Sequence, residues 1–345
     1  MGAITNVKTL SSLEKLYYND KLPIESLKSF SMLKNEKKSF QISIESETDT
    51  KVNIDINTSL KGYKLYKVCD VKSDYPMAKG ADDYYRFSDN GFYPDLLKSV
   101  GNEINLNKGI NTIWFEIDAN ENNVGNHIFS INIDGFFEEL SIEIINAELD
   151  FSDFVYTNWF HTDCLMSYYG FEAFSDEYWR VTENFLKTAC EYGMNCVLTP
   201  IFTPPLDTEV GKERPTVQLV DISLNNGKYS FNFEKLTKWI DMSKRCGITH
   251  FEMAHFFTQW GAKHAPKIME TVDGEYKKIF DWETKADSKE YEAFLTDFSV
   301  ELKRYFEENN LKDKVLIHVS DEPTFPILNS YSKASKLIYK LFKGY

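Results

Sequence analysis

The pattern of apolar residues changes near residue 150, and this change constrains the fold more than any other feature of the sequence. Before it, apolar and polar residues alternate in short runs, as in residues 39–45 and 111–117. Turn signals such as Asp134-Gly135 separate these runs. Several short alternating strands without helices between them are typical of a β-sandwich. We therefore predict an N-terminal all-β sandwich domain over residues 1–150.

Residues 84–97 form an aromatic-rich stretch within this first half and include Pro94. We interpret them as a long loop between strands, packed by its own aromatic side chains. The alternative interpretation is a contact with the next domain or with a ligand. The first half contains no recognisable constellation of catalytic residues.

After residue 150, short apolar runs alternate with longer amphipathic segments. Strands are predicted at 154–160, 196–199, 248–255 and 315–320, and helices at 177–192, 233–246, 288–308 and 327–342. Consecutive strand–helix units imply a parallel sheet. Long segments follow the second and third strands, whereas the connections from helix to strand are short. This asymmetry is typical of a (β/α)8 barrel, in which the catalytic loops follow the strands.

The predicted second domain, residues 151–345, thus corresponds to about four β/α units of such a TIM-type barrel. A doubly wound open sheet also fits the alternation, but no glycine-rich phosphate turn follows any strand. Half a barrel exposes sheet edges and apolar surface, at a cost of about 10 kcal/mol when burial contributes roughly 25 cal/mol per Å². We therefore expect the chain to be part of a longer polypeptide, or to bury this surface in a homo-oligomer.

The fourth predicted strand ends in two adjacent carboxylates, Asp321 and Glu322, followed by Pro323. Side chains alternate along a strand, so Glu322 is expected on the same face as His318. Carboxylates at the carboxyl end of a parallel strand are where an α/β barrel carries its catalytic groups. In the alternative interpretation, Asp321 caps the following helix and Glu322 lies in its first turn.

Other polar and aromatic residues follow the remaining predicted strands. The candidates for substrate binding are His161, Asp163, Arg214, His255, Trp260 and His264. Carboxylates, hydrogen-bonding groups and aromatic faces together suit a neutral sugar. For His161 and Asp163 the alternative is a loop ion pair or a helix cap. Arg214 and Gln218 either reach the substrate or fasten a hairpin, and for Gln218 we favour the hairpin.

Composition narrows the classes of partner. The formal charge of −14 argues against nucleic acid and anionic membranes, which need basic patches. The five cysteines have no CxxC spacing, and His255 and His264 do not form a zinc motif such as HExxH, so neither a metal nor a cofactor is predicted. No apolar signal region opens the sequence and no run approaches membrane-spanning length. A cytoplasmic location is therefore expected.

Several motifs resemble those of a known family. They are Trp159-Phe160-His161-Thr162-Asp163-Cys164, Thr199-Pro200-Ile201-Phe202-Thr203-Pro204-Pro205-Leu206-Asp207, Glu213-Arg214-Pro215-Thr216-Val217-Gln218-Leu219-Val220, Phe257-Thr258-Gln259-Trp260-Gly261-Ala262-Lys263-His264-Ala265-Pro266 and Ser320-Asp321-Glu322-Pro323. Together they look like bacterial members of glycoside hydrolase family 123, relatives of β-N-acetylgalactosaminidases. The resemblance is strong from about residue 150 onward and looser before it.

The resemblance implies a β-sandwich followed by a (β/α)8 barrel, and retaining hydrolysis of a terminal β-linked N-acetylhexosamine, with N-acetylgalactosamine as the first candidate. It also implies that the 2-acetamido group of the substrate is the nucleophile, an exception to the usual pair of carboxylates. Glu322 would protonate the leaving oxygen and then activate water, while Asp321 would stabilise the oxazoline-like intermediate. The alternative is a carbohydrate-binding protein without catalysis, or an inactive fragment.

Overall fold

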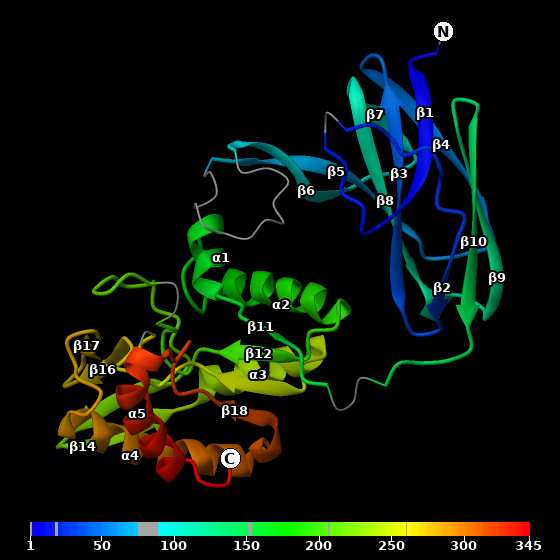
Figure 1. Cartoon of the computed structure of the whole chain (residues 1–345). Coiled ribbons are helices and arrows are strands. Elements are labelled where there is room, and N and C mark those ends of the chain that lie inside the picture. Colours follow the sequence, from blue (N-terminus) through cyan, green and yellow to red (C-terminus); the bar gives the residue numbers. More distant parts are fainter. Residues whose placement is uncertain (1, 18–19, 75–88, 151–153, 206–207, 260) are drawn as a thin grey trace. The chain divides into compact units, whose positions relative to one another are not determined.

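The computed structural model describes residues 2–17, 20–74, 89–150, 154–205, 208–259 and 261–345. The chain divides into two units, residues 1–152 and 153–345 (Figure 1). The first unit is built mostly of β-strands, and the second combines helices with a parallel sheet. The predicted order of a mostly β part followed by an α/β part is therefore confirmed.

The first unit has two five-stranded sheets, in the orders β1–β3–β8–β5–β6 and β2–β10–β9–β4–β7. Their strands are β1 (Ile4–Ser11), β2 (Ser29–Leu33), β3 (Lys37–Ser46), β4 (Thr50–Thr58), β5 (Lys64–Ser73), β6 (Gly91–Ser99), β7 (Glu103–Leu106), β8 (Gly109–Asp118), β9 (Gly125–Ile133) and β10 (Phe136–Ile145). Alternate side chains of these strands form a single apolar cluster. At its centre the ring of Phe115 lies 4.9 Å from that of Phe40 and 5.6 Å from that of Phe129.

Strand β6 corrects the prediction of a loop over residues 84–97. Residues 91–99 form a strand that pairs antiparallel with β5, while residues 84–88 lie outside the described part of the chain. Pro94 is compatible with this strand because β6 is at the edge of its sheet, where one side needs no backbone donors. The register shifts between Cys69 and Asp70, next to the proline, as expected of a bulge.

The second unit is organised by a four-stranded parallel sheet in the order β11–β12–β15–β18. Its strands are β11 (Thr157–Asn158), β12 (Cys196–Thr199), β15 (His250–Met253) and β18 (Val315–Ile317). All four lie within the predicted runs, and β11, β15 and β18 are shorter than predicted. Closure of this sheet into a barrel stays a prediction.

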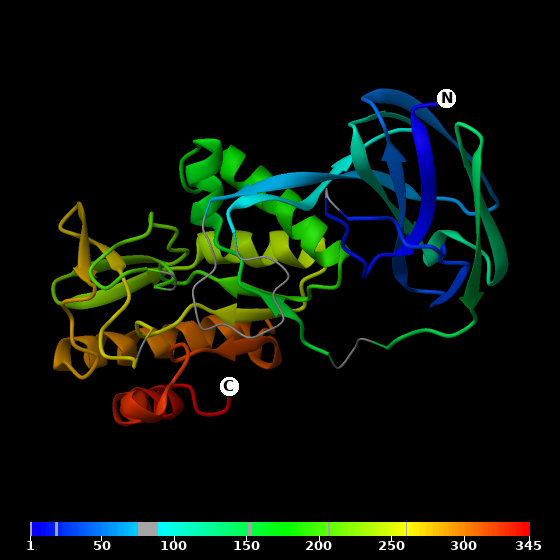
Figure 2. The same cartoon turned by 45° about the horizontal axis from the view of Figure 1, so that its top comes forward.

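Helices follow the strands of this sheet and pack along it (Figures 1 and 2). They are α1 (Thr162–Tyr169), α2 (Asp176–Glu191), α3 (Glu234–Cys246), α4 (Lys289–Glu308) and α5 (Leu328–Leu341). Ser175 caps α2 by accepting a hydrogen bond from the backbone N–H of Tyr178 at 3.2 Å. Trp239, Phe251 and Phe298, from α3, β15 and α4, are fully buried in their shared core. None of the helices described has the length and apolar content needed to cross a membrane.

The long segments after β12 and β15 meet in a second sheet, ordered β14–β13–β16–β17 and seen at the left of Figure 1. Its strands are β13 (Asp221–Asn225), β14 (Lys228–Asn232), β16 (Ile268–Val272) and β17 (Glu275–Phe280). Gln218 fastens the two segments: its amide donates to the carbonyl oxygens of Val220 and Met269, each at 2.8 Å, and accepts from the N–H of Met269 at 3.0 Å. The favoured interpretation of Gln218 is thus confirmed.

Candidate active site

Asp321 and Glu322 follow β18 at the carboxyl end of the parallel sheet. The backbone between them and the strand is held by Phe256 and Phe257, whose N–H groups donate to the carbonyl oxygens of His318 and Val319 at 3.3 and 3.1 Å. Asp321 is half-buried and Glu322 is exposed. Neither carboxylate forms a hydrogen bond or an ion pair with another residue of the described chain. Both are therefore available to a ligand.

The backbone at Glu322 and the position of the next helix decide against the capping interpretation. Glu322 has a φ of 42°, in the left-handed region that non-glycine residues rarely adopt. The 3₁₀ helix η3 (Phe325–Ile327) has its N-cap at Thr324, and α5 has its N-cap at Ile327. Asp321 therefore caps neither helix. A non-glycine residue in this conformation costs about 1–3 kcal/mol and is common at functional sites.

A buried carboxylate, Glu252, lies in β15 on the polar face of the same sheet. Its Oε1 accepts a hydrogen bond from Nδ1 of His318 at 2.6 Å. The indole N–H of Trp159 is 3.2 Å from both carboxylate oxygens, and Oγ1 of Thr157 donates to Oε2 at 3.3 Å. Strands β11, β15 and β18 and the segments after them thus contribute to one cluster, which we call the Glu252 cluster: Thr157, Trp159, Glu252, His255 and His318.

These hydrogen bonds set the charge of Glu252. Burial on its own raises the pKa of the carboxyl group, but the hydrogen bond and charge of His318 and the donors of Trp159 and Thr157 lower it. The opposing effects leave the pKa of Glu252 below its ordinary value. Glu252 is consequently an ionised hydrogen-bond acceptor at neutral pH.

His255 follows β15 and is fully buried beside His318, with ring centroids 3.8 Å apart. The ring of Trp159 meets it edge-on at 5.3 Å. Neither ring nitrogen of His255 has a hydrogen-bond partner among the described residues. Burial, followed by the nearby imidazoles of His318 and His161, lowers the pKa of His255 to about 3. This imidazole is therefore neutral at physiological pH.

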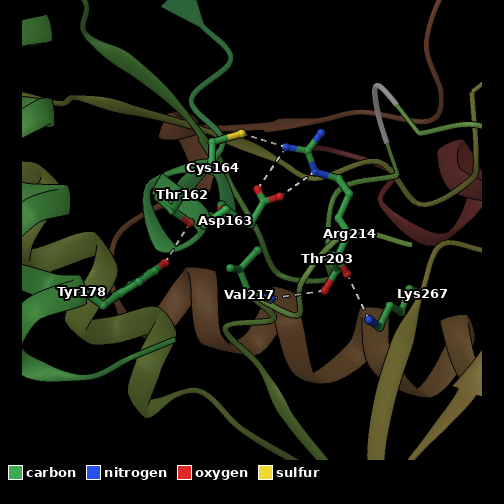
Figure 3. A network of polar contacts seen from close by, with 9 residues as sticks. Thr162, Asp163, Cys164, Tyr178, Thr203, Arg214, Val217 and Lys267 are labelled. Atoms are coloured by element: carbon green, nitrogen blue, oxygen red, sulfur yellow. Dashed lines mark hydrogen bonds and ion pairs between the residues drawn. The ribbon is translucent and has the colours of Figure 1, made fainter. Parts of the chain in front are cut away.

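Asp163 and Arg214 form a buried ion pair, drawn in Figure 3. The guanidinium faces the carboxylate with two N–H groups, at 2.9 Å from Oδ2 and 3.1 Å from Oδ1, and also contacts Sγ of Cys164 at 3.3 Å. Asp163 lies in the first turn of α1, and His161 occupies the N-cap position without a side-chain cap. Asp163 is therefore in an ion pair with Arg214, whereas the alternative weighed from the sequence was a loop ion pair with His161.

The segment that carries Arg214 is itself fastened to the second sheet. Lys267 donates to the carbonyl oxygen of Arg214 at 3.0 Å and lies 3.2 Å from the carboxylate of Glu213, which also pairs with Lys278. Burial of the guanidinium and these contacts hold Arg214 in one orientation. Arg214 and Asp163 therefore lie together, whereas their role in substrate binding stays a prediction.

The last two sequence-predicted residues, His264 and Trp260, lie on the long segment after β15. His264 lines a cavity of about 450 Å³, together with Lys263, Lys285, Asn329, Ser330 and Lys333. That lining includes neither the residues of the Glu252 cluster nor Asp321 and Glu322. Trp260 lies outside the described residues.

Sequence reasoning missed Glu252 and His318 as members of the site. A signal was present: Glu252 stands between Phe251 and Met253 in an apolar strand, where a carboxylate must be buried with donors around it. Its partners lie on strands distant in sequence and could not be identified from spacing. No group of three His, Cys, Asp or Glu side chains in the described part of the chain has the arrangement of a metal site.

Comparisons with known proteins were made by sequence and by structure. The model of the glycoside hydrolase 123 catalytic domain matches residues 159–344. A search of curated proteins found no match.

Among solved structures, one match is a family 123 glycoside hydrolase from Clostridium perfringens, analysed for glycolipid glycan hydrolysis. It is 15% identical, with a TM-score of 0.71 over 95% of this chain and 60% of its own. The present chain thus spans about 60% of the length of that structure, and the likeness shows a shared fold. A second match is domains 4 and 5 of the S-layer protein SbsC, which are 6% identical over 41% of this chain and 52% of their own. A third is AvmM, which catalyses macrocyclization in alchivemycin A biosynthesis and is 7% identical over 43% of this chain and 92% of its own. Their TM-scores of 0.20 carry no argument.

Proposed function

Because the chain belongs to glycoside hydrolase family 123, we propose that it removes a terminal β-linked N-acetylhexosamine from a glycan, with retention of the anomeric configuration. N-acetylgalactosamine is the first candidate for this sugar. The glycan chains of glycolipids are candidate substrates, since the Clostridium perfringens relative was studied with such glycans.

The observation that carries the proposal is the pair of adjacent, unpartnered carboxylates at the carboxyl end of β18. In the first step, Glu322 as an acid donates its proton to the glycosidic oxygen while the acetamido oxygen of the sugar attacks the anomeric carbon. Asp321, ionised, accepts a hydrogen bond from the acetamido N–H and stabilises the positive charge of the oxazoline-like intermediate. In the second step, Glu322 removes a proton from the water that opens the intermediate.

Two other buried carboxylates of this unit, Glu252 and Asp163, support the choice of a substrate nucleophile. Both oxygens of Glu252 accept hydrogen bonds from neighbouring side chains, and both oxygens of Asp163 accept from Arg214. A carboxylate whose oxygens are both engaged is a poor nucleophile, because attack would require these bonds to break. The acetamido group of the substrate can supply the nucleophile instead, as in other substrate-assisted glycosidases.

The test compares two aryl β-glycosides that differ only at carbon 2 of the sugar, one with an acetamido group and one with a hydroxyl. We expect hydrolysis of the acetamido compound only, with the β-anomer as the first product seen by proton NMR. Equal cleavage of the two compounds would overturn substrate assistance. Binding of the sugar in calorimetry without any hydrolysis after prolonged incubation would instead identify a carbohydrate-binding protein.

A further inference from the structure

The Glu252 cluster contains an imidazole that is oriented by a buried carboxylate and open to solvent. We propose that His318 is a further substrate-binding residue, whose Nε2 forms a hydrogen bond with a hydroxyl group of the sugar, and that Glu252 is its positioning residue. This inference rests on the proposed function, because it assigns an additional contact to the same site.

The contact between the two side chains fixes the tautomer of His318. Glu252 is an acceptor, so the proton of the 2.6 Å hydrogen bond between Nδ1 and Oε1 comes from the imidazole. Nε2 then faces away from Glu252, and a sugar hydroxyl, which both donates and accepts, can be its partner with or without a proton on Nε2. Nε2 has no hydrogen-bond partner among the described residues and is not one of the buried unsatisfied atoms, so it is in contact with solvent. The His318 side chain as a whole is 30% exposed.

The neighbours of His318 hold the plane of its ring. Glu252 is only 8% exposed and cannot rotate without losing its bonds to Trp159 and Thr157. The ring of His255 packs against that of His318 at 3.8 Å, and the indole of Trp159 lies 6.0 Å away. A side chain that is already oriented loses little conformational entropy when it binds a ligand. His318 therefore has the fixed orientation expected of a binding residue.

His318 is close in the chain to the proposed catalytic pair, Asp321 and Glu322. His318 lies three residues before Asp321 on the segment after β18, and its carbonyl oxygen is held by the N–H of Phe256. The indole of Trp159 beside it is 37% exposed, which leaves an aromatic face for a sugar ring. The site therefore offers a hydrogen-bonding group on the segment after β18, which continues to the carboxylates, and a stacking surface on the segment after β11.

Charge in the cluster selects the class of group that His318 binds. Glu252 carries a negative charge, and the neighbouring His255 is neutral and adds no positive charge to balance a bound anion. A carboxylate or phosphate at Nε2 would meet the field of Glu252, which His318 at most cancels. A sugar hydroxyl carries no charge, so a neutral pyranose hydroxyl is the group that fits.

Two isosteric substitutions separate substrate contact from a purely structural role. His318→Gln places an amide near the position of Nε2, whereas His318→Asn places one near Nδ1 and keeps only the contact with Glu252. We expect His318→Asn to raise KM for an aryl 2-acetamido glycoside roughly 3- to 10-fold, the loss typical of one hydrogen bond, and His318→Gln to restore most of it. The matched control is His250→Gln on the same strand as Glu252, two residues earlier, which should leave KM unchanged.

The second readout requires no turnover. In protein labelled with ¹⁵N at histidine, N-acetylgalactosamine should move the Nε2 resonance of His318 while its Nδ1 stays protonated, and Glu252→Gln should weaken binding of the sugar in calorimetry. If the Nε2 resonance shifts in a protein that does not hydrolyse glycosides, the role of His318 in sugar binding is supported and the proposed catalysis is refuted. The two proposals are thus tested independently. Absence of sugar binding, an unchanged Nε2 resonance at saturating sugar, or His318→Asn performing as well as His318→Gln would each overturn the inference.

Discussion

Each unit has a central strand that buries a glutamate, and the two glutamates differ in their partners. Glu116 in β8 is 5% exposed, and its carboxylate lies 3.5 Å from Nζ of Lys64, a half-exposed side chain on the neighbouring strand. Glu252 in β15 is 6% exposed and is held by an imidazole, an indole and a hydroxyl. Burial of the two carboxylates is alike, whereas the donors around them are not.

The difference teaches that burial of a charged group indicates function only together with its surroundings. The lysine beside Glu116 neutralises a carboxylate within a sheet whose other face is an apolar core. The donors of Glu252 include His318, which still presents a polar atom to solvent next to unpartnered Asp321 and Glu322. The donors of Glu252 position the His318 imidazole for a ligand, whereas the lysine beside Glu116 only balances the charge of that carboxylate.

The largest effect should come from the acid of the proposed reaction. Glu322→Gln removes the proton donor, and general acid catalysis contributes ~10²–10⁴-fold, so kcat/KM for a 2-acetamido glycoside with a poor leaving group should fall by that factor. Thermal unfolding should be unchanged because Glu322 is exposed. Glu143→Gln, at an exposed position of β10 in the first unit, is the control and should retain full activity.

The next effect contrasts the two buried glutamates directly. Glu252→Ala leaves the donors of His318 and Trp159 without their acceptor, and loss of one partner of a buried charged pair costs about 3–5 kcal/mol. Glu116→Ala removes a pair whose lysine is half-exposed, and should cost about 1 kcal/mol. Urea denaturation measures both free energies of unfolding. Equal losses for the two variants would contradict the comparison.

How far the sequence predicts the molecule also differs between the units. In the first unit, alternation predicts strands because every strand has one apolar face, as in β3 and β8. It fails at β6, where an edge position tolerates Pro94 and the exposed Phe92, so the strand carries no alternating signal. In the second unit, all four parallel strands were predicted, because fully buried strands are apolar runs bounded by turn signals.

The candidate site was predictable only where its residues are adjacent in the chain. Asp321 and Glu322 were recognisable together because they are consecutive and follow an apolar run. The Glu252 cluster joins residues from three strands, and its members meet only through the register of the sheet, in which Glu252 pairs with Leu316 two residues before His318. Spacing in the sequence carries no information on that register, which the packing of the helices determines.

A smaller effect tests the buried ion pair of the second unit against an exposed one. Arg214→Lys cannot reproduce the two parallel N–H contacts with Asp163, and loss of one charge-assisted hydrogen bond should destabilise the protein by about 1.5–3 kcal/mol. Arg180→Lys, in the exposed pair with Glu177 on α2, should leave stability nearly unchanged. Chemical denaturation of both variants gives the comparison, which fails when the two losses are equal.

The smallest effect concerns pH and His255. Its pKa in the folded protein is lowered to about 3, chiefly by burial, whereas an unfolded histidine titrates near ~6.5. Between these values the unfolded chain binds a proton that the folded chain does not, so the free energy of unfolding falls as the pH falls below ~6.5, by about 1.4 kcal/mol per pH unit. Above that pH both states are neutral and the contribution is constant.

Replacement by a non-titrating side chain isolates this term. His255→Leu should remove the slope between pH 5 and 6.5, a window above the range in which the lowered pKa of Glu252 acts. Wild type and His250→Leu, the control on the same strand, should both show the decline when urea denaturation is repeated across the window. An identical pH dependence in wild type and His255→Leu would mean that His255 takes up a proton in the folded state. The cluster would then hold the positive charge of a protonated His255, and its preference for an uncharged sugar hydroxyl would no longer follow.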